Sequence, residues 1–268
     1  MVKVEFFVKS ETDQIKSILD MLKTKDEKIS LVDYCVGKQN PFAQRVIDFF
    51  GIDVASLEGK LPEEKEEIIA GIVRVVYKKE LPNMKDKAVD FQQHWDNNEQ
   101  LINNEFTEIF NRDMPSKICR SEVSINPCCP RNLQGWSFDV FSEKTKEQGI
   151  HTAAHEITHF LWREKVKQLF PNLDEKLLEA PNDHWRLSEI AIAPIFNNSK
   201  LKNLSSDTKA GYVPFFNKTQ QEKEQIAEHF NQMYLNGGLD NFITKGIKDV
   251  ERINASGNQL VEENEKMM

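Results

Sequence analysis

The sequence has few cysteines, no long apolar run and no block of basic residues, and each absence narrows what the chain can be. The 268 residues include four cysteines, and none of them forms a C-x-x-C pair, which disfavours a cysteine-bound metal. No apolar run approaches the length of a transmembrane helix. With 35 basic and 43 acidic residues the formal charge is −8, which argues against nucleic-acid or anionic-membrane binding.

The first residues and the cysteines favour a cytoplasmic protein. Charges interrupt the apolar residues in M-V-K-V-E-F-F-V, so this segment does not resemble a secretory signal and is expected to form an amphipathic strand. A bridge between Cys119 and Cys128 or Cys129 is an alternative, but free thiols are typical of the reducing cytoplasm and are expected here.

The first half of the chain is expected to be mainly helical. Helical spacing of apolar residues predicts helices over 10–22, 41–50 and 62–81, followed over 84–111 by one long helix or a broken pair. Gly51 is the expected end of the second helix. No glycine-rich phosphate loop or repeat is present. Residues 1–85 are therefore expected to form a helical region that carries no functional motif.

A short β segment and further helices follow. Residues 117–126 alternate in strand fashion, a turn-rich stretch follows, and 136–141 again read as a strand, which predicts a hairpin. Helices are expected over 219–235 and 239–253, separated by Gly237 and Gly238. A loop or lid is expected over 197–209 and a frayed acidic tail over 256–268. The predicted fold is α+β and predominantly helical, with a catalytic domain over 86–255.

The motif that points to chemistry is H-E-I-T-H, from His155 to His159. Two histidines four apart lie on one face of a helix, where their imidazoles can bind one metal ion, and Glu156 between them stands beside a water on that ion. Apolar and uncharged neighbours frame the pair, which disfavours a merely solvated surface helix. This is the pattern of zinc metallopeptidases.

A catalytic zinc needs a third protein ligand. A third histidine in H-E-x-x-H-x-x-G-x-x-H is excluded, because Trp162 and Lys165 occupy the required positions. Glu189 is the favoured ligand: it is a lone carboxylate before Ile-Ala-Ile-Ala, where an unpartnered anion would be costly. Asn182 or Asp183 can cap its helix, and Pro194 limits it. The competing carboxylates are Glu164, Glu175, Glu179 and Asp183.

With this ligand set, the segment from about Ser116 to Pro194 resembles the gluzincins, zinc peptidases whose HExxH helix is followed by a helix with a glutamate ligand. The resemblance implies a zincin-like domain, with a small sheet before the active-site helix and one Zn²⁺ per chain held by His155, His159 and Glu189. It departs from several gluzincins at Ala193, where they place an aspartate that orients a zinc-bound histidine.

The resemblance also implies a mechanism. Zinc would lower the pKa of its water to about 7, and Glu156 would act as the general base during attack on a peptide carbonyl. Tyr212 is the preferred oxyanion donor by this resemblance; His184, His229 and Arg186 are the other candidates. The expected partner is a peptide or protein substrate. No G-A-M-E-N run precedes the motif, so endopeptidase and exopeptidase action both stay open, as does the oligomeric state.

Two alternatives remain at this stage. The zinc could be structural or serve partner binding, in which case His151, one turn before His155, is the residue that could close the site. Alternatively, the enzyme could hydrolyse a non-peptide amide or ester. The first alternative is disfavoured by Glu156, because a structural zinc gains nothing from a positioned base.

Overall fold

The computed structural model describes residues 1–22, 41–180, 182–205, 215 and 218–255. Helices predominate in these residues, and a small mixed sheet accompanies them, so the α+β prediction is confirmed at this level. In chain order the elements are β1 (Val2–Val8), α1 (Glu11–Leu22), α3 (Pro41–Phe50), η1 (Val54–Leu57), α4 (Pro62–Phe110), β2 (Lys117–Ser124), β3 (Arg131–Asn132), β4 (Ser137–Phe141), α5 (Lys146–Leu169), η2 (Glu175–Leu178), α6 (Asp183–Asn197), η3 (Lys200–Leu204) and α7 (Gln220–Ala255). Within the part of the chain that is described, no helix is both long enough and apolar enough to cross a membrane.

The chain divides into two compact units, each discontinuous in sequence. The sheet unit comprises Val2–Asn98 and Ser116–Ala153, and the motif unit comprises Met1, Glu99–Pro115 and Ala154–Met268. The boundary expected near residue 85 falls inside α4 and inside the sheet unit. The two units therefore meet in the chain within two helices, after Asn98 in α4 and after Ala153 in α5.

The sheet has the strand order β1-β2-β4-β3. β1 pairs with β2 and β2 pairs with β4 in parallel, whereas β3 and β4 are antiparallel. The hairpin expected from 117–126 and 136–141 is therefore wrong: both segments are strands, but they run in the same direction. The antiparallel partner of β4 is the two-residue strand β3, which lies within the stretch expected to be a turn.

Helix α4 is one continuous helix, so the separate helices expected over 62–81 and 84–111 are wrong. Pro82 lies inside it, although an internal proline removes a hydrogen bond and normally costs about 3 kcal/mol. Side chains before and after the proline, such as Tyr77, Met84 and Phe91, are buried in the interior of the sheet unit. Packing of this kind offsets a local proline cost, since helix stability in proteins comes mostly from tertiary contacts.

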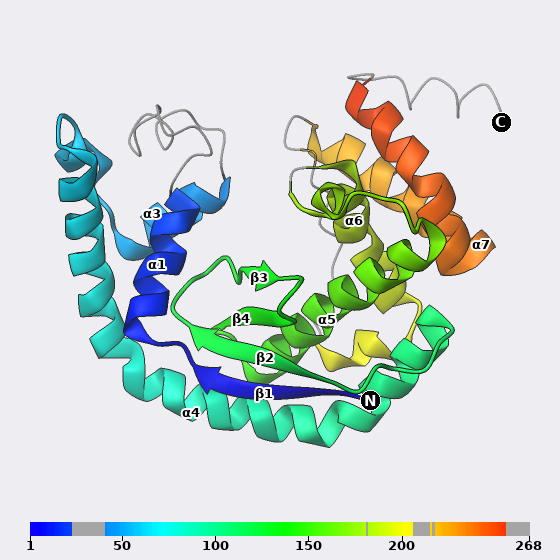
Figure 1. Cartoon of the computed structure of the whole chain (residues 1–268), viewed down its shortest axis with the longest axis horizontal. Coiled ribbons are helices and arrows are strands. Elements are labelled where there is room, and N and C mark those ends of the chain that lie inside the picture. The colour runs from blue at the N-terminus through cyan, green and yellow to red at the C-terminus, as the bar shows by residue number, and fades with distance from the viewer. Residues whose placement is uncertain (23–40, 181, 206–214, 216–217, 256–268) are drawn as a thin grey trace. The chain divides into compact units, whose positions relative to one another are not determined.

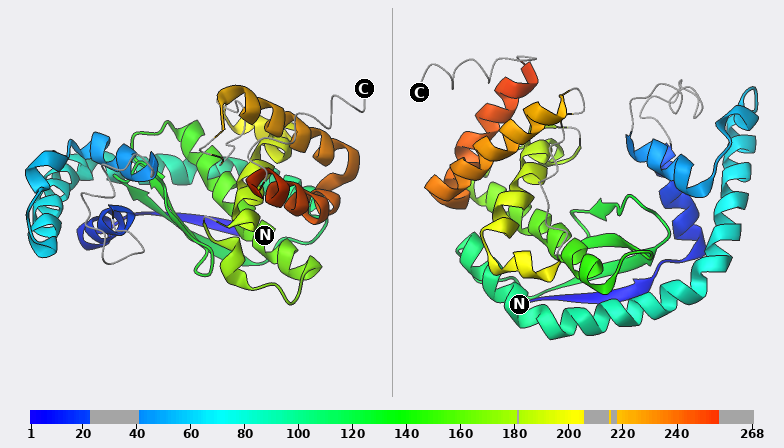
Figure 2. Two further views of the ribbon diagram at one scale, coloured as in Figure 1. Left: turned by 90° about the horizontal axis from the view of Figure 1, so that it is seen from above. Right: turned by 180° about the vertical axis from the view of Figure 1, so that it is seen from behind.

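The stretch of α4 around Phe91 and Gln92, within the sheet unit, runs along the sheet next to β1 (Figures 1 and 2). The Gln92 amide donates to the Val4 carbonyl at 3.0 Å and accepts from the Phe6 backbone N–H at 3.0 Å. The Phe6 and Phe91 rings lie 5.8 Å apart between centroids. A side chain therefore satisfies backbone groups on the outer edge of β1, which an edge strand otherwise leaves open to another chain.

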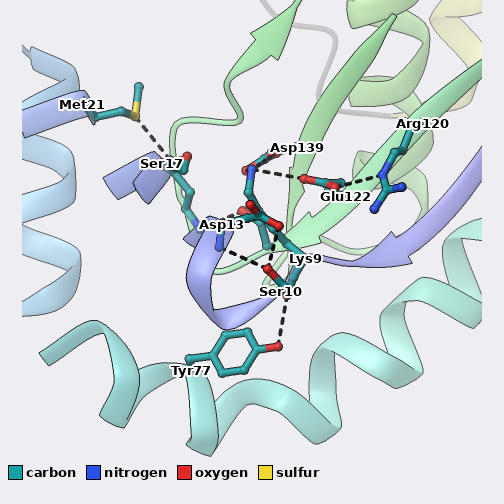
Figure 3. Close-up of polar contacts among 11 residues, drawn as sticks. Lys9, Ser10, Asp13, Ser17, Met21, Tyr77, Arg120, Glu122 and Asp139 are labelled. Carbon is teal, nitrogen blue, oxygen red and sulfur yellow. Dashed lines mark hydrogen bonds and ion pairs between the residues drawn. The ribbon is translucent and has the colours of Figure 1, made fainter. Parts of the chain in front are cut away.

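A buried ion pair joins Lys9, the residue after β1, to Asp139 in the middle of β4 (Figure 3). The Lys9 Nζ lies 2.7 Å and 2.9 Å from the two Asp139 carboxylate oxygens and 3.3 Å from Glu122 Oε2. The Tyr77 hydroxyl donates to the Lys9 carbonyl. Burial raises the pKa of Asp139 from 3.8 to about 6, because lost solvation and the nearby Glu122 outweigh Lys9 and the Ser124 hydrogen bond.

In the motif unit, α6 and α7 lie side by side (Figures 1 and 2). Gly246 of α7 approaches α6 so closely that an added Cβ would lie 2.8 Å from Leu187 Cδ1. The Trp162 ring of α5 and the Phe230 ring both contact Phe242. Gly238 (φ 66°, ψ −173°) breaks α7 into two helices, which confirms the break expected at Gly237 and Gly238.

Candidate metal centre

Helix α5 positions the two histidines of the motif. Residues His155 and His159 are one helical turn apart, so their imidazoles project from the same face. The opposite face is anchored by side chains with 0% exposure, namely Ala154, Ile157, Phe160 and Leu161. The alternation of these buried residues with the histidines is the reason that one side of the helix packs while the other carries the polar groups.

The imidazoles converge with the carboxylate of Glu189 from α6. The Nε2 atoms of His155 and His159 are 3.0 Å apart. Glu189 places Oε2 3.7 Å from His155 Nε2 and Oε1 3.5 Å from His159 Nε2. Each of the three residues offers one ligand atom, and these atoms all lie within 4.8 Å of one another. The sequence-predicted ligand set is therefore brought together, and all three residues belong to the motif unit.

These separations fit a metal ion. Zinc bonds to imidazole nitrogen and carboxylate oxygen are about 2.0–2.2 Å long, so two ligand atoms of a tetrahedral site lie about 3.3 Å apart. The Nε2–Nε2 separation of 3.0 Å and the separations of 3.5 and 3.7 Å from the two Nε2 atoms to the two Glu189 oxygens fall on both sides of that value. The His155, His159 and Glu189 group is thus close enough to bind a metal ion.

The burial of the group is uneven. The side chains of His159 and Glu189 are only 2% and 8% exposed, whereas that of His155 is 24% exposed. Placing a carboxylate in such surroundings is unfavourable unless a cation or a hydrogen-bond donor accompanies it. His155 is the most solvent-exposed member of the group.

Glu156 lies beside the group without belonging to it. Its Oε1 is 3.9 Å from His155 Nε2, and its side chain is 7% exposed. Its carboxylate is therefore held next to the ligand atoms. This is the location expected of a base that acts on a water at the site.

Helix α6 carries Glu189 in an apolar segment. Glu189 is 6% exposed, and the following Ile190 and Ala191 are almost fully buried. Asn182 holds the N-cap position that the sequence allowed for it, but its side-chain amide donates to the Lys176 and Glu179 carbonyls. Pro194 lies inside the helix, which ends shortly afterwards at Asn197.

The competing carboxylates are engaged elsewhere. Glu175 forms ion pairs with Arg163 and Lys167, and Asp183 accepts hydrogen bonds from Arg186 and Asn254. Glu164 lies 3.6 Å from Arg163 Nη1, and Glu179 is exposed. His151 is also outside the ligand group. Of the carboxylates that the sequence left open, the structure brings only Glu189 to the histidines.

The structure describes three of the four candidate oxyanion donors, His184, His229 and Arg186. Tyr212 lies outside the described residues. His229 Nε2 lies 2.7 Å from Asp249 Oδ2, and Arg186 donates to Asp183 at 2.8 Å. Burial lowers the pKa of His184, whose Nδ1 is buried and has no hydrogen-bond partner in the described part of the chain. His229 and Arg186 are thus already held by carboxylates, and neither is placed as an oxyanion donor.

Comparison with known proteins assigns no family. No protein-family model matches the chain, no curated protein matches it, and no solved structure matches it. The arrangement of His155, Glu156, His159 and Glu189 is therefore the observation that bears on function.

Proposed function

We propose that this chain is a zinc-dependent metallopeptidase of gluzincin type, in which His155, His159 and Glu189 bind the ion and Glu156 is the general base. The observation that carries the proposal is the convergence of the three ligand side chains: the two Nε2 atoms lie 3.0 Å apart, and each lies 3.5–3.7 Å from one of the two Glu189 carboxylate oxygens. Two helices supply this ligand set, the motif helix α5 and the following helix α6, as the gluzincin resemblance implies.

The donor set supports zinc and an open site. Two imidazole nitrogens and one carboxylate oxygen are ligands that Zn²⁺ accepts in hydrolytic enzymes, whereas structural zinc sites are usually closed by a fourth cysteine or histidine. His151 is the residue that could close the site, and it does not belong to the ligand group. When bound, zinc supplies a Lewis acid that makes a water acidic near neutral pH and polarises a carbonyl.

Glu156 performs the proton transfers in this proposal. Its carboxylate is held 3.9 Å from His155 Nε2, so a water beside the ligand atoms lies within reach of one of its oxygens. The carboxylate accepts the proton of the attacking water and then donates it to the nitrogen of the leaving amine. The Glu156 side chain is only 7% exposed. Bulk water therefore has little access to the carboxyl group and does not readily exchange the proton that it carries.

The substrate class and location follow from the same proposal. A peptide or protein is the substrate that the zincin pattern favours, and in this proposal the four-stranded sheet would be the small sheet of a zincin-like domain. None of the three described cysteines, Cys119, Cys128 and Cys129, is in a disulfide. This supports a cytoplasmic location, since reducing compartments keep thiols reduced.

The test compares Glu156→Gln with Glu164→Gln, a matched change on the same helix. Each purified protein is assayed for zinc content and for cleavage of a quenched-fluorescent peptide library. We expect Glu156→Gln to keep its zinc and to lose roughly 10²–10⁴-fold in turnover, because an amide cannot accept the proton. Glu164→Gln is expected to behave as wild type.

Unchanged cleavage in Glu156→Gln would refute the general-base assignment. If wild-type protein binds zinc but cleaves no peptide in the library, while it hydrolyses simple amides or esters, the non-peptide alternative replaces the peptidase.

A further inference from the structure

The first part of α4 carries an exposed apolar stripe with a seven-residue period. Its positions are Leu61, which immediately precedes α4, then Ile68, Val75 and Pro82, and Val89 continues the repeat. Leu61, Val75 and Val89 are 64%, 70% and 56% exposed, and Ile68 is 36% exposed. Seven residues are nearly two helical turns, so these side chains lie along one side of the helix. Isolated exposed apolar residues are common, but a regular repeat is the pattern of a helix–helix seam.

The centre of the stripe is flat and open. Gly71 and the half-buried Ile72 fill the space between Ile68 and Val75, which gives apolar or small residues at i, i+3, i+4 and i+7. A Cβ built on Gly71 would meet no atom of the described chain within 4 Å. A second helix could therefore approach closely at this glycine. We call Leu61, Ile68, Gly71, Ile72, Val75 and Pro82 the α4 stripe.

The opposite face of α4 is buried inside the sheet unit. Ile69 and Val73 are 0% exposed, and they alternate with the residues of the α4 stripe along the same turns. A helix that has an apolar stripe on each of two faces needs a partner for the second one, because a solvated helix normally carries one apolar stripe only.

The order of residues in the α4 stripe is symmetric about its middle. Counted outward from the bond between Gly71 and Ile72, Ile68 stands opposite Val75, and Leu61 stands opposite Pro82. A two-fold axis at this point would place equivalent apolar positions of two antiparallel copies against each other. Contacts of this self-complementary kind are those of a C2 dimer.

The charges that flank the stripe have the matching arrangement. The half before its centre is mainly acidic, with Glu63, Glu64, Glu66 and Glu67 against Lys65, and the half after it is mainly basic, with Arg74, Lys78 and Lys79 against Glu80. In an antiparallel pair the acidic half of one helix faces the basic half of the other, and Glu64 stands opposite Lys79. A parallel pair would place like charges together, which is unfavourable.

We propose that the α4 stripe is the interface of an antiparallel homodimer of this chain. The segment from Leu61 to Pro82 is about 33 Å long at 1.5 Å per residue. A single helix pair of this length lies at the small end of protein interfaces, so the dimer forms in a concentration-dependent manner. The proposal is independent of the metal centre, since every residue of the α4 stripe belongs to the sheet unit.

The first experiment is sedimentation velocity of the full chain from about 1 to about 100 μM, a range that brackets a weak interface. Wild type is expected to pass from monomer to dimer. Val75→Asp is expected to raise the dissociation constant at least about tenfold. Leu235→Asp is the matched control, because Leu235 is 52% exposed on α7, and it should leave the constant unchanged. A wild-type chain that stays monomeric throughout overturns the proposal.

The second experiment tests the direction of the helices by charge reversal. Glu64→Lys and Lys79→Glu should each weaken the dimer, because each places two like charges across the interface. The double variant should recover a dissociation constant within about threefold of wild type, since the pairs reform with opposite sign. Glu64 Oε2 also accepts from the Leu61 backbone N–H at 2.8 Å, but recovery in the double variant would occur without that bond. Single variants as strong as wild type, or a double variant weaker than both, contradict the antiparallel arrangement.

Discussion

His159 Nε2 lies 3.5 Å from Glu189 Oε1, and the two side chains come from different helices, α5 and α6. Both are nearly excluded from solvent. The close approach requires α6 to pack against α5, because no local segment of the chain holds both residues. The ligand group therefore exists only in the folded motif unit, and an ion that binds it must stabilise that unit.

Zinc is accordingly expected to raise the unfolding temperature of the protein. An ion present at 100 times its dissociation constant contributes about 2.7 kcal/mol if it binds the folded state alone. Treatment with a chelator should lower the midpoint of thermal unfolding, followed by circular dichroism, and zinc should restore it. The shift should be absent in Glu189→Ala. An equal shift in that variant would show that the ion acts somewhere else.

The buried Asp139 carboxyl gives the stability a specific pH dependence. Its pKa is raised from 3.8 to about 6 by burial, so between these pH values the folded state binds more protons than the unfolded state. The free energy of unfolding contributed by this group is therefore greatest below pH 4 and falls by about 3 kcal/mol as the pH rises through 6.

Urea unfolding of wild type and Asp139→Asn at pH 4, 5, 6 and 7 measures this contribution, because asparagine does not titrate. The stability difference, wild type minus variant, should decrease as the pH rises. An increase with pH would mean that the attraction of Lys9, only 2.7 Å away, dominates over burial and lowers the pKa of Asp139 instead.

Local patterns were sufficient for much of the fold. Alternating apolar residues predict β1, Gly51 ends α3 with φ +61°, and Gly238 breaks α7. In each case the cause lies within a few residues of the effect. Such features depend on side-chain period or on the conformations that glycine alone adopts easily.

The features that the sequence did not predict depend on residues far apart in the chain. The parallel pairing of β2 and β4 is one, because a turn-rich stretch between two strands is most simply read as a hairpin and the direction of pairing leaves no local signal. The continuity of α4 through Pro82 is another, since it depends on burial in the sheet unit. The Lys9 and Asp139 pair is a third: charged residues in amphipathic strands are expected at the surface.

The candidate site was more predictable than the sheet. The spacing of His155 and His159 places them on one helical face, and the apolar segment around Glu189 indicates a carboxylate that needs a cation. What the sequence could not supply is the packing of α6 on α5, which sets the separations among the three ligand atoms.

The most direct test of the central claim is the zinc content of the purified chain, measured by elemental analysis for wild type, Glu189→Ala and Glu175→Ala. Glu175 is the control, because it was a competing carboxylate and is held by Arg163 and Lys167. We predict about one zinc per chain in wild type and Glu175→Ala, and an affinity at least about 100-fold weaker in Glu189→Ala, since even residues that only orient a ligand cost 10–100-fold. Wild-type protein without zinc, or zinc bound equally well by Glu189→Ala, would contradict the proposed metal centre.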